Sequence, residues 1–394
     1  MRLLVLSFYY SPDLSAGSFR TTALVKALRE RAPSGTVIDV VTTSPNRYAS
    51  FSREAAHTET AAGVEIRRIA LPAHHSDIRG QSRAFAAFAR GAVAAVAGHE
   101  YNLVYATSSR LMTAALGAWI ARRKRARLYL DIRDIFVDTI GQVLPPVAAR
   151  IARSLFAPLE SWTIGRADRV NLVSPGFEPY FRSRYGQRSF AAFTNGIDEE
   201  FLTEAPAAVR PPRGGTTVTV LYAGNVGEGQ GLHQILPPLG TALRGRARFV
   251  VIGDGGRRQA LAAALERAGV DNVELRSPVP RAQLIRAYHE ADVLLLHLGR
   301  QAAFERVLPS KVFEYAALGK PLLAGVAGYA AHFIREQIDN AAVFPPCDTA
   351  AAVRAFESLD LADRPRPGFV AKYARAQISA ALADDVLALA RRGS

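Results

Sequence analysis

The chain has 394 residues, of which 49% are apolar and 21% charged, and its formal net charge is +14. This composition is typical of a compact soluble protein, and the length predicts two domains. No apolar run approaches the roughly 20 residues of a membrane-spanning helix, and the apolar start is too short for a signal peptide. The single cysteine, Cys347, excludes an internal disulfide and fits a reducing compartment. We therefore expect a cytoplasmic protein with anionic partners.

Short apolar runs rich in β-branched residues alternate with helix-like segments along the chain, which predicts parallel sheets covered by helices. In the first half we expect strands at 3–7, 37–42, 64–69, 102–106, 127–131, 169–173 and 191–194. In the second half we expect them at 218–223, 248–252, 272–275, 292–296, 321–324 and 341–344. This number of strands is large for one open sheet and predicts two sheets.

A Pro- and Gly-rich segment at 199–216 is expected to link the two lobes. It separates a Rossmann-like lobe at 1–198 from a second one at 217–373. After it, VTVLYAGNVGEGQGL restarts the order of strand, glycine loop and helix that opened the chain as RLLVLSFYYSPDLSAGS. The final segment, 374–394, contains a helix at about 374–391 that can return to the first lobe.

Parallel sheets bind ligands at the carboxyl ends of their strands, so loops after strands are the candidate binding segments. In the first loop, 8–18, Gly17 and Ser18 stand at the start of a helix expected over 18–31. The N–H groups of such a helix start can bind an anion. The alternative is a turn glycine followed by an N-cap serine.

Two glycine-rich loops follow strands of the second half. Loop 224–231 (GNVGEGQG) contains four glycines, which allow the backbone to approach a phosphate closely. It is not a GxGxxG dinucleotide fingerprint, and the alternative is a flexible loop. In loop 251–256 (VIGDGG), Asp254 either contacts a substrate hydroxyl or caps the next helix.

The segment 304–321, FERVLPSKVFEYAALGKP, predicts a helix that begins at Pro309–Ser310 and ends at Gly319–Pro321. Lys311 falls in its first turn, where the ammonium and the helix N-terminus act together on an anion. Glu314 lies one turn deeper on the same face, at a depth suited to a ribose diol. The alternative is a Lys–Glu surface pair.

Two further charged residues, Arg133 and Asp134, follow the first-lobe strand 127–131 in the sequence DIRD. Charges at a strand end are costly unless they are paired or functional. They therefore predict either a ligand contact in the cleft between the lobes or a structural Arg–Asp pair.

Taken together, these motifs resemble the large retaining GT-B glycosyltransferase family typified by family 4. The resemblance rests on SFYYSPDLSAGSFR, DIRD, TNGID, YAGNVGEGQGL, VIGDGG and AFERVLPSKVFEYAALGKP, and covers nearly the whole chain. The chain most resembles the bacterial fucosaminyltransferase-like enzymes of O-antigen and capsule assembly, which carry similar YAGN-G-Q and PSK-FEY-GKP signatures. The resemblance implies an α/β GT-B fold, with two Rossmann-like lobes facing across a cleft.

The resemblance also implies a reaction. A sugar, such as an N-acetylated amino sugar, passes from a nucleotide donor, with UDP favoured, to a saccharide or polyprenyl-diphosphate-linked saccharide acceptor. The anomeric configuration is retained, and neither a metal nor a cofactor is needed beyond the nucleotide sugar as co-substrate. In agreement, the sequence contains no DxD triplet, the usual metal-holding motif of the other major glycosyltransferase fold.

Site residues carried over from the resemblance fall into three groups. The residues expected to bind the donor are Gly17, Asn225, Gly227, Gln230, Asp254, Ser310, Lys311 and Glu314. The residues expected to act in catalysis are Lys311, Asp134 and Arg133. The residues expected to contact the sugar or the acceptor are Ser18, Arg20, Glu305 and Arg306.

The chain departs from the family pattern in three places. Asn225 and Gln230 replace the family's phosphate-binding Arg and Lys, as in the fucosaminyltransferase-like group, which leaves Lys311 as the main expected phosphate contact. The first of two family glutamates falls on Arg306, with Glu305 beside it, so which of them contacts the sugar stays open. The family's first-lobe histidine is missing.

Basic residues of the first lobe lie beside apolar segments, a pattern that attracts anionic lipid. They are Arg79, Arg83, Arg90, Arg122, Arg123, Lys124, Arg125, Arg127, Arg150 and Arg153. This predicts a peripheral position on the inner face of the cell membrane, whereas the alternative is a solvated arginine-rich face.

Two other functions share some of these features. A GT-B-like nucleotide-sugar epimerase would have the same lobes and would turn donor alone into its epimer. A basic nucleic-acid-binding protein is suggested only by the charge of +14. The charge is dispersed and the sequence lacks a recognisable binding module, so we expect no nucleic-acid partner.

Overall fold

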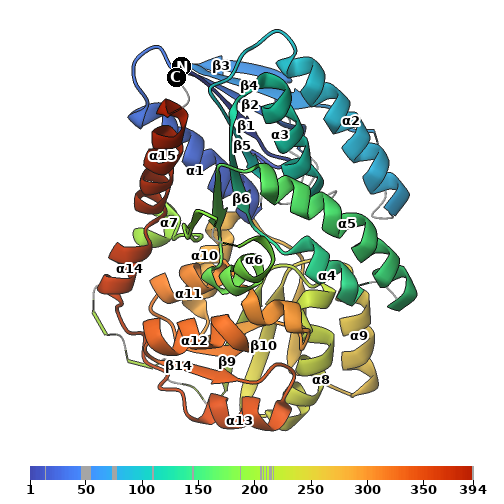
Figure 1. The fold of residues 1–394 in the computed structure, drawn as a ribbon. Coiled ribbons are helices and arrows are strands. Elements are labelled where there is room, and N and C mark those ends of the chain that lie inside the picture. The colour runs from blue at the N-terminus through green and yellow to red at the C-terminus, as the bar shows by residue number, and fades with distance from the viewer. Residues whose placement is uncertain are drawn as a thin grey trace. The chain divides into compact units, whose positions relative to one another are not determined.

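The structure is a computed structural model that describes residues 1–13, 15–45, 55–72, 78–108, 111–143, 146–186, 188–204, 206, 208–209, 211–212, 215 and 217–392. The chain forms two compact units (Figure 1). The first comprises Met1–Asn195 with Arg375–Ser394, and the second comprises Gly196–Ala374. Each unit has the α/β architecture expected from the alternation of strand and helix segments. Among the described residues, no helix combines the length and the apolar character needed to cross a membrane.

The first unit is built on one sheet, with strand order β3-β4-β2-β1-β5-β6-β7-β8 in the described residues. The strands are β1 (Arg2–Leu6), β2 (Val37–Thr43), β3 (Thr58–Ala61), β4 (Val64–Ile69), β5 (Leu103–Thr107), β6 (Arg127–Ile132), β7 (Arg169–Leu172) and β8 (Phe190–Ala191). All neighbouring strands pair in parallel except β3, which pairs with β4 antiparallel.

Helices cover this sheet, and the last helix of the chain is one of them (Figure 1). They are α1 (Ala16–Arg31), α2 (Ile78–Val96), α3 (Leu111–Lys124), α4 (Phe136–Val143), α5 (Pro146–Arg166), α6 (Glu178–Tyr185) and α15 (Arg375–Arg391). Leu382 and Val386 of α15 are buried with Leu24 of α1 in one core cluster. Asp385 of α15 accepts hydrogen bonds from Tyr129 and Arg169. The C-terminal helix therefore completes the first unit.

The second unit contains one fully parallel sheet, with strand order β11-β10-β9-β12-β13-β14 in the described residues. Its strands are β9 (Val218–Ala223), β10 (Ala247–Ile252), β11 (Val273–Arg276), β12 (Val293–His297), β13 (Leu322–Gly325) and β14 (Ala341–Phe344). Its helices are α7 (Glu199–Leu202), α8 (Leu232–Ala242), α9 (Arg258–Arg267), α10 (Arg281–Glu290), α11 (Lys311–Ala317), α12 (Gly328–Gln337), α13 (Thr349–Glu357) and α14 (Pro367–Tyr373).

The strand order of the second sheet reverses between β9 and β12. Successive strands run from β9 to β11 on one side, and from β12 to β14 on the other. Such a switch point is where open parallel sheets bind ligands, because the loops of the two halves diverge there. The loops after β9, β10 and β12 are therefore the places to examine for a site.

The prediction of two sheets is confirmed, and each predicted strand overlaps an observed one. Strand β3 was missed because all four of its residues, TETA, are exposed, and an edge strand without buried side chains has no hydrophobic pattern. The strand expected at 191–194 is only Phe190–Ala191. Beyond it, the carbonyls of Phe193 and Thr194 accept hydrogen bonds from Arg20 instead of pairing with a strand.

Part of the linker expected at 199–216 lies outside the described residues. Its first residues form helix α7, which packs on the second unit. Phe201 in α7 is 1% exposed and belongs to a core cluster of the second unit. Asp198 accepts a hydrogen bond from Arg281 at 2.5 Å. This segment is thereby anchored to α10.

Candidate functional site

The glycine loops after β9 and β10 lie directly against each other. Gly224 has φ 144° and Gly255 has φ 155°, a backbone region in which other residues are strained. A Cβ on Gly253 would lie 1.8 Å from the Gly224 carbonyl oxygen, and one on Gly255 would lie 2.6 Å from that of Val226. The Val226 N–H donates to the Asp254 carbonyl at 2.8 Å. These glycines are required by the close approach of the two loops.

Lys311 extends from the start of α11 onto the loop after β9. A Cβ on Gly224 would lie 2.3 Å from Lys311 Cε and 2.9 Å from Nζ, so any larger residue at this position would displace the end of the lysine side chain. Within the described residues the ammonium makes no hydrogen bond and no ion pair. Burial lowers the pKa of Lys311, while nearby Glu314 raises it and Arg281 lowers it. An unpaired cation is thus held against a glycine loop.

Glu314 lies three residues beyond Lys311 on the same helix and is half-buried. Its carboxylate likewise has no hydrogen bond or ion pair in the described part of the chain. The nearby carboxylate of Glu314 raises the pKa of Arg281. Arg281 nevertheless donates its hydrogen bond to Asp198, and its Cζ lies 4.8 Å from the ring centroid of Phe201. Glu314 therefore remains available to accept hydrogen bonds from a ligand.

Asn225, Gly227 and Gln230, all predicted to bind the donor, lie together in the loop after β9. The Gln230 Oε1 atom accepts hydrogen bonds from Asn225 Nδ2 at 2.9 Å and from Gly227 N at 3.1 Å. The Gln230 carbonyl oxygen contacts His297 Nδ1 at 2.7 Å. These contacts fix the loop conformation, so the two amide side chains shape the loop beside Lys311.

Asp254 and Ser310 complete the predicted donor set in the second unit. Asp254 is exposed, and its Oδ1 accepts a hydrogen bond from the adjacent Gly255 N–H at 2.7 Å. Helix α9 begins at Arg258 with Arg257 at its cap, so the capping alternative for Asp254 is wrong. Ser310 occupies the N-cap position of α11 without a capping hydrogen bond from its side chain.

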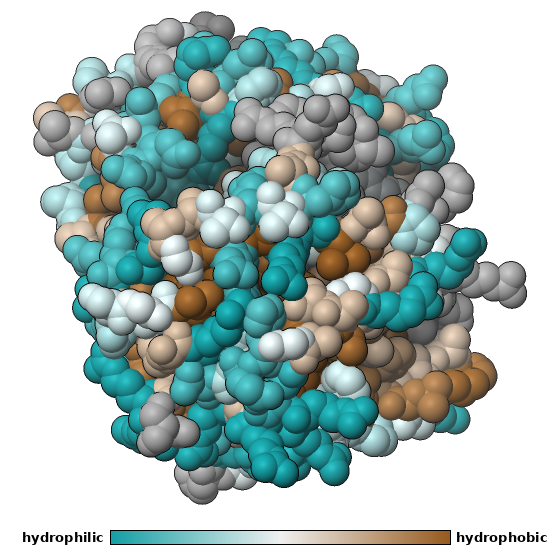
Figure 2. Space-filling model, turned by 90° about the horizontal axis from the view of Figure 1, so that it is seen from above, coloured by the Kyte–Doolittle hydropathy of each residue, from teal (hydrophilic) through white to brown (hydrophobic). Residues whose placement is uncertain are grey.

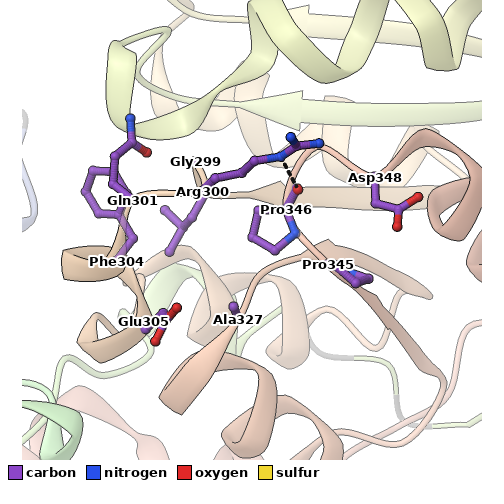
Figure 3. Close-up of a pocket in the computed structure, with 10 residues that line it drawn as sticks. Gly299, Arg300, Gln301, Phe304, Glu305, Ala327, Pro345, Pro346 and Asp348 are labelled. Carbon is purple, nitrogen blue, oxygen red and sulfur yellow. Dashed lines mark hydrogen bonds between the residues drawn. The ribbon is translucent and has the colours of Figure 1, made fainter. Parts of the chain in front are cut away.

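A cavity of about 340 Å³ lies at the carboxyl ends of β12, β13 and β14 (Figure 3). It is lined by Leu298, Gly299, Arg300, Gln301, Phe304, Glu305, Ala327, Pro345, Pro346 and Asp348. A Cβ on Gly229 would lie 2.7 Å from the Phe304 ring, and the Gly299 N–H donates to the Gly229 carbonyl at 2.8 Å. The cavity therefore borders the same glycine loop.

The side chains around the cavity differ in what they can offer a ligand. Figure 3 shows the Arg300 guanidinium directed at the Pro346 carbonyl, to which it donates at 3.0 Å. Gln301 Oε1 is buried and has no hydrogen-bond partner among the described residues. Glu305 is exposed and lines the cavity, whereas Arg306 is not among the lining residues.

In the first unit, Arg20 occupies a buried network. Its guanidinium donates to both carboxylate oxygens of Asp131, at 2.9 and 3.0 Å, and to the carbonyls of Phe193 and Thr194. Asn171 Nδ2 donates to the same carboxylate at 2.7 Å. Arg20 is 3% exposed, and all three of its guanidinium nitrogens donate to protein oxygens. Arg20 was expected to contact the sugar or the acceptor, but the structure places it in a buried ion pair.

Gly17 and Ser18 are both buried in the first turn of α1. The N-cap is Ser15, whose hydroxyl accepts from the Ser18 N–H at 3.2 Å, so the alternative of Ser18 as N-cap is wrong. The helix begins two residues before the expected start because Ser15 provides this cap. The Ser18 hydroxyl is buried without a partner in the described part of the chain.

Arg133 and Asp134 do not pair with each other. Arg133 donates its N–H to Ser108 Oγ at 3.0 Å, and its Nη1 is buried with no partner among the described residues. Burial lowers the pKa of Arg133 to about 10, against an opposite effect of Asp131. It therefore stays charged at neutral pH. Asp134 is exposed, and its Oδ1 accepts from the Ile135 N–H.

Several residues around these sites were not anticipated from the sequence. Asp131 pairs with Arg20 across 111 positions, and Arg281 approaches Glu314 from another helix. Long-range charge pairs leave no local signal in one sequence. For Phe304 and Gln301, the only available signal was their proximity to the PSK motif.

Comparisons with known proteins agree with this architecture. Residues 17–196 match the family described as "Glycosyl transferase 4-like domain", and residues 217–360 match "Glycosyl transferases group 1". Apart from Gly196, the first match falls in the first unit, and the second match falls in the second unit. The chain thus carries two glycosyltransferase-family domains, one in each unit.

A curated relative, "Probable glycosyltransferase WbjE" of Pseudomonas aeruginosa, is 26% identical over 246 residues. The match covers 58% of this chain and 59% of that relative, so this chain spans about three-fifths of the relative's length. The resemblance stated above is therefore supported at the level of glycosyltransferase domains.

Among solved structures, WaaG, a glycosyltransferase involved in lipopolysaccharide biosynthesis, has a TM-score of 0.61 at 14% identity. That comparison covers 100% of this chain and 98% of WaaG. HepE of Anabaena, in complex with UDP, has a TM-score of 0.56 at 15% identity, again over 100% and 98% of the two chains. These likenesses confirm the predicted GT-B fold.

Proposed function

We propose that this chain, with its two glycosyltransferase-family domains, transfers a sugar from a UDP-linked donor to a saccharide or a polyprenyl-diphosphate-linked saccharide. We further propose an N-acetylated amino sugar as the transferred group, retention of its anomeric configuration, and no metal or cofactor besides the nucleotide sugar. The observation that carries the proposal is the Lys311 ammonium, which lies against Gly224 of the glycine loop and has no partner in the part of the chain that the structure describes.

Lys311 would bind the diphosphate. A half-buried cation without a counter-ion is unfavourable in the free protein, and an anion that enters beside it relieves this cost. The same charge stabilises the negative charge that develops on the leaving phosphate, where a metal would otherwise be needed. The loop fixed by Asn225, Gly227 and Gln230 would form the wall opposite this cation, with Ser310 at its edge.

Glu314, one turn further along α11, would accept hydrogen bonds from the ribose hydroxyls, and Asp254 would contribute a further hydroxyl contact. The sugar would enter the cavity beside the glycine loop. Phe304 offers an apolar ring there, and Glu305 offers a carboxylate for sugar hydroxyls. Since Glu305 lines the cavity and Arg306 does not, Glu305 is the residue that we assign to the sugar.

Transfer with retention requires the acceptor oxygen to bond to the anomeric carbon on the face from which the diphosphate leaves. The acceptor hydroxyl proton passes to an oxygen of the leaving diphosphate, so the protein needs no separate base. Arg133 would stabilise phosphate charge and Asp134 would orient the acceptor, both from the first unit. At the start of α1, Gly17 would contribute its backbone N–H group to the donor, and Ser18 would contribute to the acceptor its hydroxyl, which has no partner among the described residues.

The descriptions of similar solved structures support UDP as the nucleotide of the donor. HepE of Anabaena is described in complex with UDP and in complex with UDP and glucose. Another neighbour is an α,α-trehalose-phosphate synthase described as UDP-forming. WaaG is described as involved in lipopolysaccharide biosynthesis, which supports a saccharide acceptor. We further propose that the enzyme acts in the cytoplasm at the inner face of the membrane. The comparisons favour neither the epimerase nor the nucleic-acid-binding alternative.

Isothermal titration with UDP, GDP and ADP tests the proposal. We expect UDP to bind most tightly and Lys311→Ala to weaken it about tenfold or more, since a hydrogen bond to a charged group is worth roughly 1.5–3 kcal/mol. Lys372→Ala is the matched control, because Lys372 is an exposed lysine on α14 of the same unit. Equal UDP affinity of wild type and Lys311→Ala would show that the diphosphate binds elsewhere.

A further inference from the structure

Four tyrosines are among the largest fully buried side chains of the described residues: Tyr105, Tyr129, Tyr288 and Tyr315. On the face of the molecule in Figure 2, hydrophilic side chains predominate and hydrophobic ones lie scattered among them. A hydroxyl group that is removed from such a surface costs free energy unless it finds a hydrogen-bond partner. The partner of each buried tyrosine therefore indicates what its hydroxyl does.

The Tyr315 hydroxyl binds the backbone of strand β9. The side chain comes from α11, one turn after Lys311 and directly after Glu314. Its Oη accepts a hydrogen bond from the Ala223 N–H at 3.3 Å and donates to the Ala223 carbonyl at 3.5 Å. Burial raises the pKa of Tyr315, so the hydroxyl keeps its proton and can bond both groups at neutral pH.

The backbone of Ala223 needs this hydroxyl because the sheet opens at that point. In the described residues, β9 pairs with β12 only at Val220 and Leu221, while its pairing with β10 continues to Ala223. Backbone groups of successive residues point alternately to the two neighbouring strands of a parallel sheet. Since the Gly224 N–H donates to Ile252 of β10 at 2.8 Å, the groups of Ala223 face the side on which β12 has diverged. Tyr315 fills this gap at the switch point of the sheet.

The strand end that Tyr315 holds is also the base of the glycine loop. Ala223 is the last residue of β9, and the next residue, Gly224, lies against the Lys311 side chain. Tyr315 and Lys311 therefore reach two adjacent residues from one helix. Together they fix the distance between α11 and the loop that it faces.

The other buried tyrosines do not make such a connection. Tyr129 donates to Asp385 in the first unit. The hydroxyls of Tyr105 and Tyr288 have no hydrogen-bond partner among the described residues. Tyr288 lies on α10, with its ring edge-on against that of Tyr315 at a centroid distance of 5.3 Å. It therefore carries an equally buried hydroxyl beside the same helix, without a bond to the loop.

We propose that Tyr315 is a positioning residue of the donor site, which sets the place of the Lys311 ammonium against the glycine loop. This inference rests on the proposed function, in which Lys311 binds the diphosphate. With α11 tied to the end of β9, the cation and the loop form one fixed site before a ligand arrives. Such a site binds more tightly because its parts need not be ordered when the ligand enters. Tyr315 is 0% exposed and acts only through Lys311.

The test is titration calorimetry with UDP on the full chain and on the variants Y315F, Y288F, Lys311→Ala and Y315F with Lys311→Ala. Y315F removes the hydroxyl and keeps the ring. We expect it to weaken UDP binding about fivefold, which corresponds to one hydrogen bond between neutral groups. Y288F removes an equally buried hydroxyl and should leave UDP affinity unchanged. The melting temperature of each variant is measured, and all titrations are made well below the lowest one.

The double variant separates positioning from a general loss of stability. If Tyr315 acts through Lys311, the Lys311→Ala replacement should weaken UDP binding less in Y315F than in wild type, by a factor of about three or more. If Tyr315 only stabilises the fold, the two losses multiply. Multiplied losses, an unchanged UDP affinity of Y315F, or an equal loss in Y288F would each overturn the inference.

Hydrogen exchange of segment 222–228 measures the connection without a ligand. The segment should exchange faster in Y315F than in wild type, and at the wild-type rate in Y288F. Equal protection in all three proteins would overturn the inference, because the hydroxyl would then not hold the loop. If Lys311→Ala leaves UDP affinity unchanged, the proposed diphosphate contact fails, and the exchange result alone decides whether Tyr315 holds α11 against the loop.

Discussion

Lys311 Nζ lies where a side chain on Gly224 would be, since a Cβ on that glycine would come within 2.9 Å of it. The lysine comes from α11 and the glycine from the loop after β9, so the contact joins two motifs that are 87 positions apart in the sequence. Gly224 therefore leaves the space that the Lys311 ammonium fills.

Replacement of Gly224 by alanine should displace Lys311 and weaken UDP binding. The added methyl group would meet Lys311 Cε at 2.3 Å, and the backbone φ of 144° is strained for alanine by roughly 1–3 kcal/mol. We expect a lower melting temperature and at least a tenfold loss of UDP affinity in titration calorimetry. Gly256→Ala is the control, because a Cβ on Gly256 would meet nothing within 4 Å. Unchanged UDP affinity in Gly224→Ala would contradict the assignment of Lys311.

The pH dependence of UDP binding should report the lowered pKa of Lys311. Burial disfavours the ammonium in the free protein, while a bound diphosphate favours it, so UDP affinity should fall as pH rises through the pKa of Lys311. This decline should begin below the range in which an ordinary lysine titrates. Titrations at increasing pH should show it in wild type and not in Lys311→Met. A parallel decline in both proteins would assign it to another group.

The same shift has a consequence for folding. Because the folded pKa of Lys311 lies below the unfolded one, the unfolded state binds more protons between the two values. The contribution of Lys311 to stability therefore increases as pH rises through that window. Urea unfolding of wild type and Lys311→Met should show the difference between the two growing in favour of wild type. A constant difference across the window would show that the lysine is not perturbed.

The sequence was sufficient to predict the fold because buried parallel strands are apolar runs, and glycine loops separate them from helices. It failed where structure depends on something other than burial. Strand β3 is held by backbone hydrogen bonds with all four side chains exposed. The short β8 results from the capture of the Phe193 and Thr194 carbonyls by Arg20, a partner 173 positions away or more.

The site was predictable to the extent that its residues occur in local motifs. Lys311, Glu314 and the glycine loop could be proposed from sequence because each motif places them after a strand or in a helix turn. The ion pair of Arg20 with Asp131 and the proximity of Arg281 to Glu314 could not be predicted, because both depend on tertiary contacts between distant parts of the sequence.

His297 should make the second unit sensitive to acid. Its Nδ1 contacts the Gln230 carbonyl at 2.7 Å, and its Nε2 accepts from the Cys347 N–H at 3.0 Å, so the ring is neutral. Burial lowers its pKa from 6.5 to about 4. The unfolded state therefore binds the extra proton between these values, and stability should fall by about 3 kcal/mol as pH drops across them. Urea unfolding should show a weaker pH dependence in His297→Gln, and an equal one would contradict this role.

The structure separates Glu305 from Arg306 and so allows the sugar contact to be tested. Glu305 lines the cavity beside the glycine loop, and Arg306 does not. Glu305→Gln should therefore reduce the additional affinity of a UDP-sugar over UDP by about tenfold, with UDP affinity itself unchanged, because the lost hydrogen bonds are those to the sugar. The measurement is competition of UDP-sugars against UDP on each variant, with Arg306→Gln as the comparison. Loss of sugar discrimination in Arg306→Gln alone would move the contact to Arg306 and place the sugar outside this cavity.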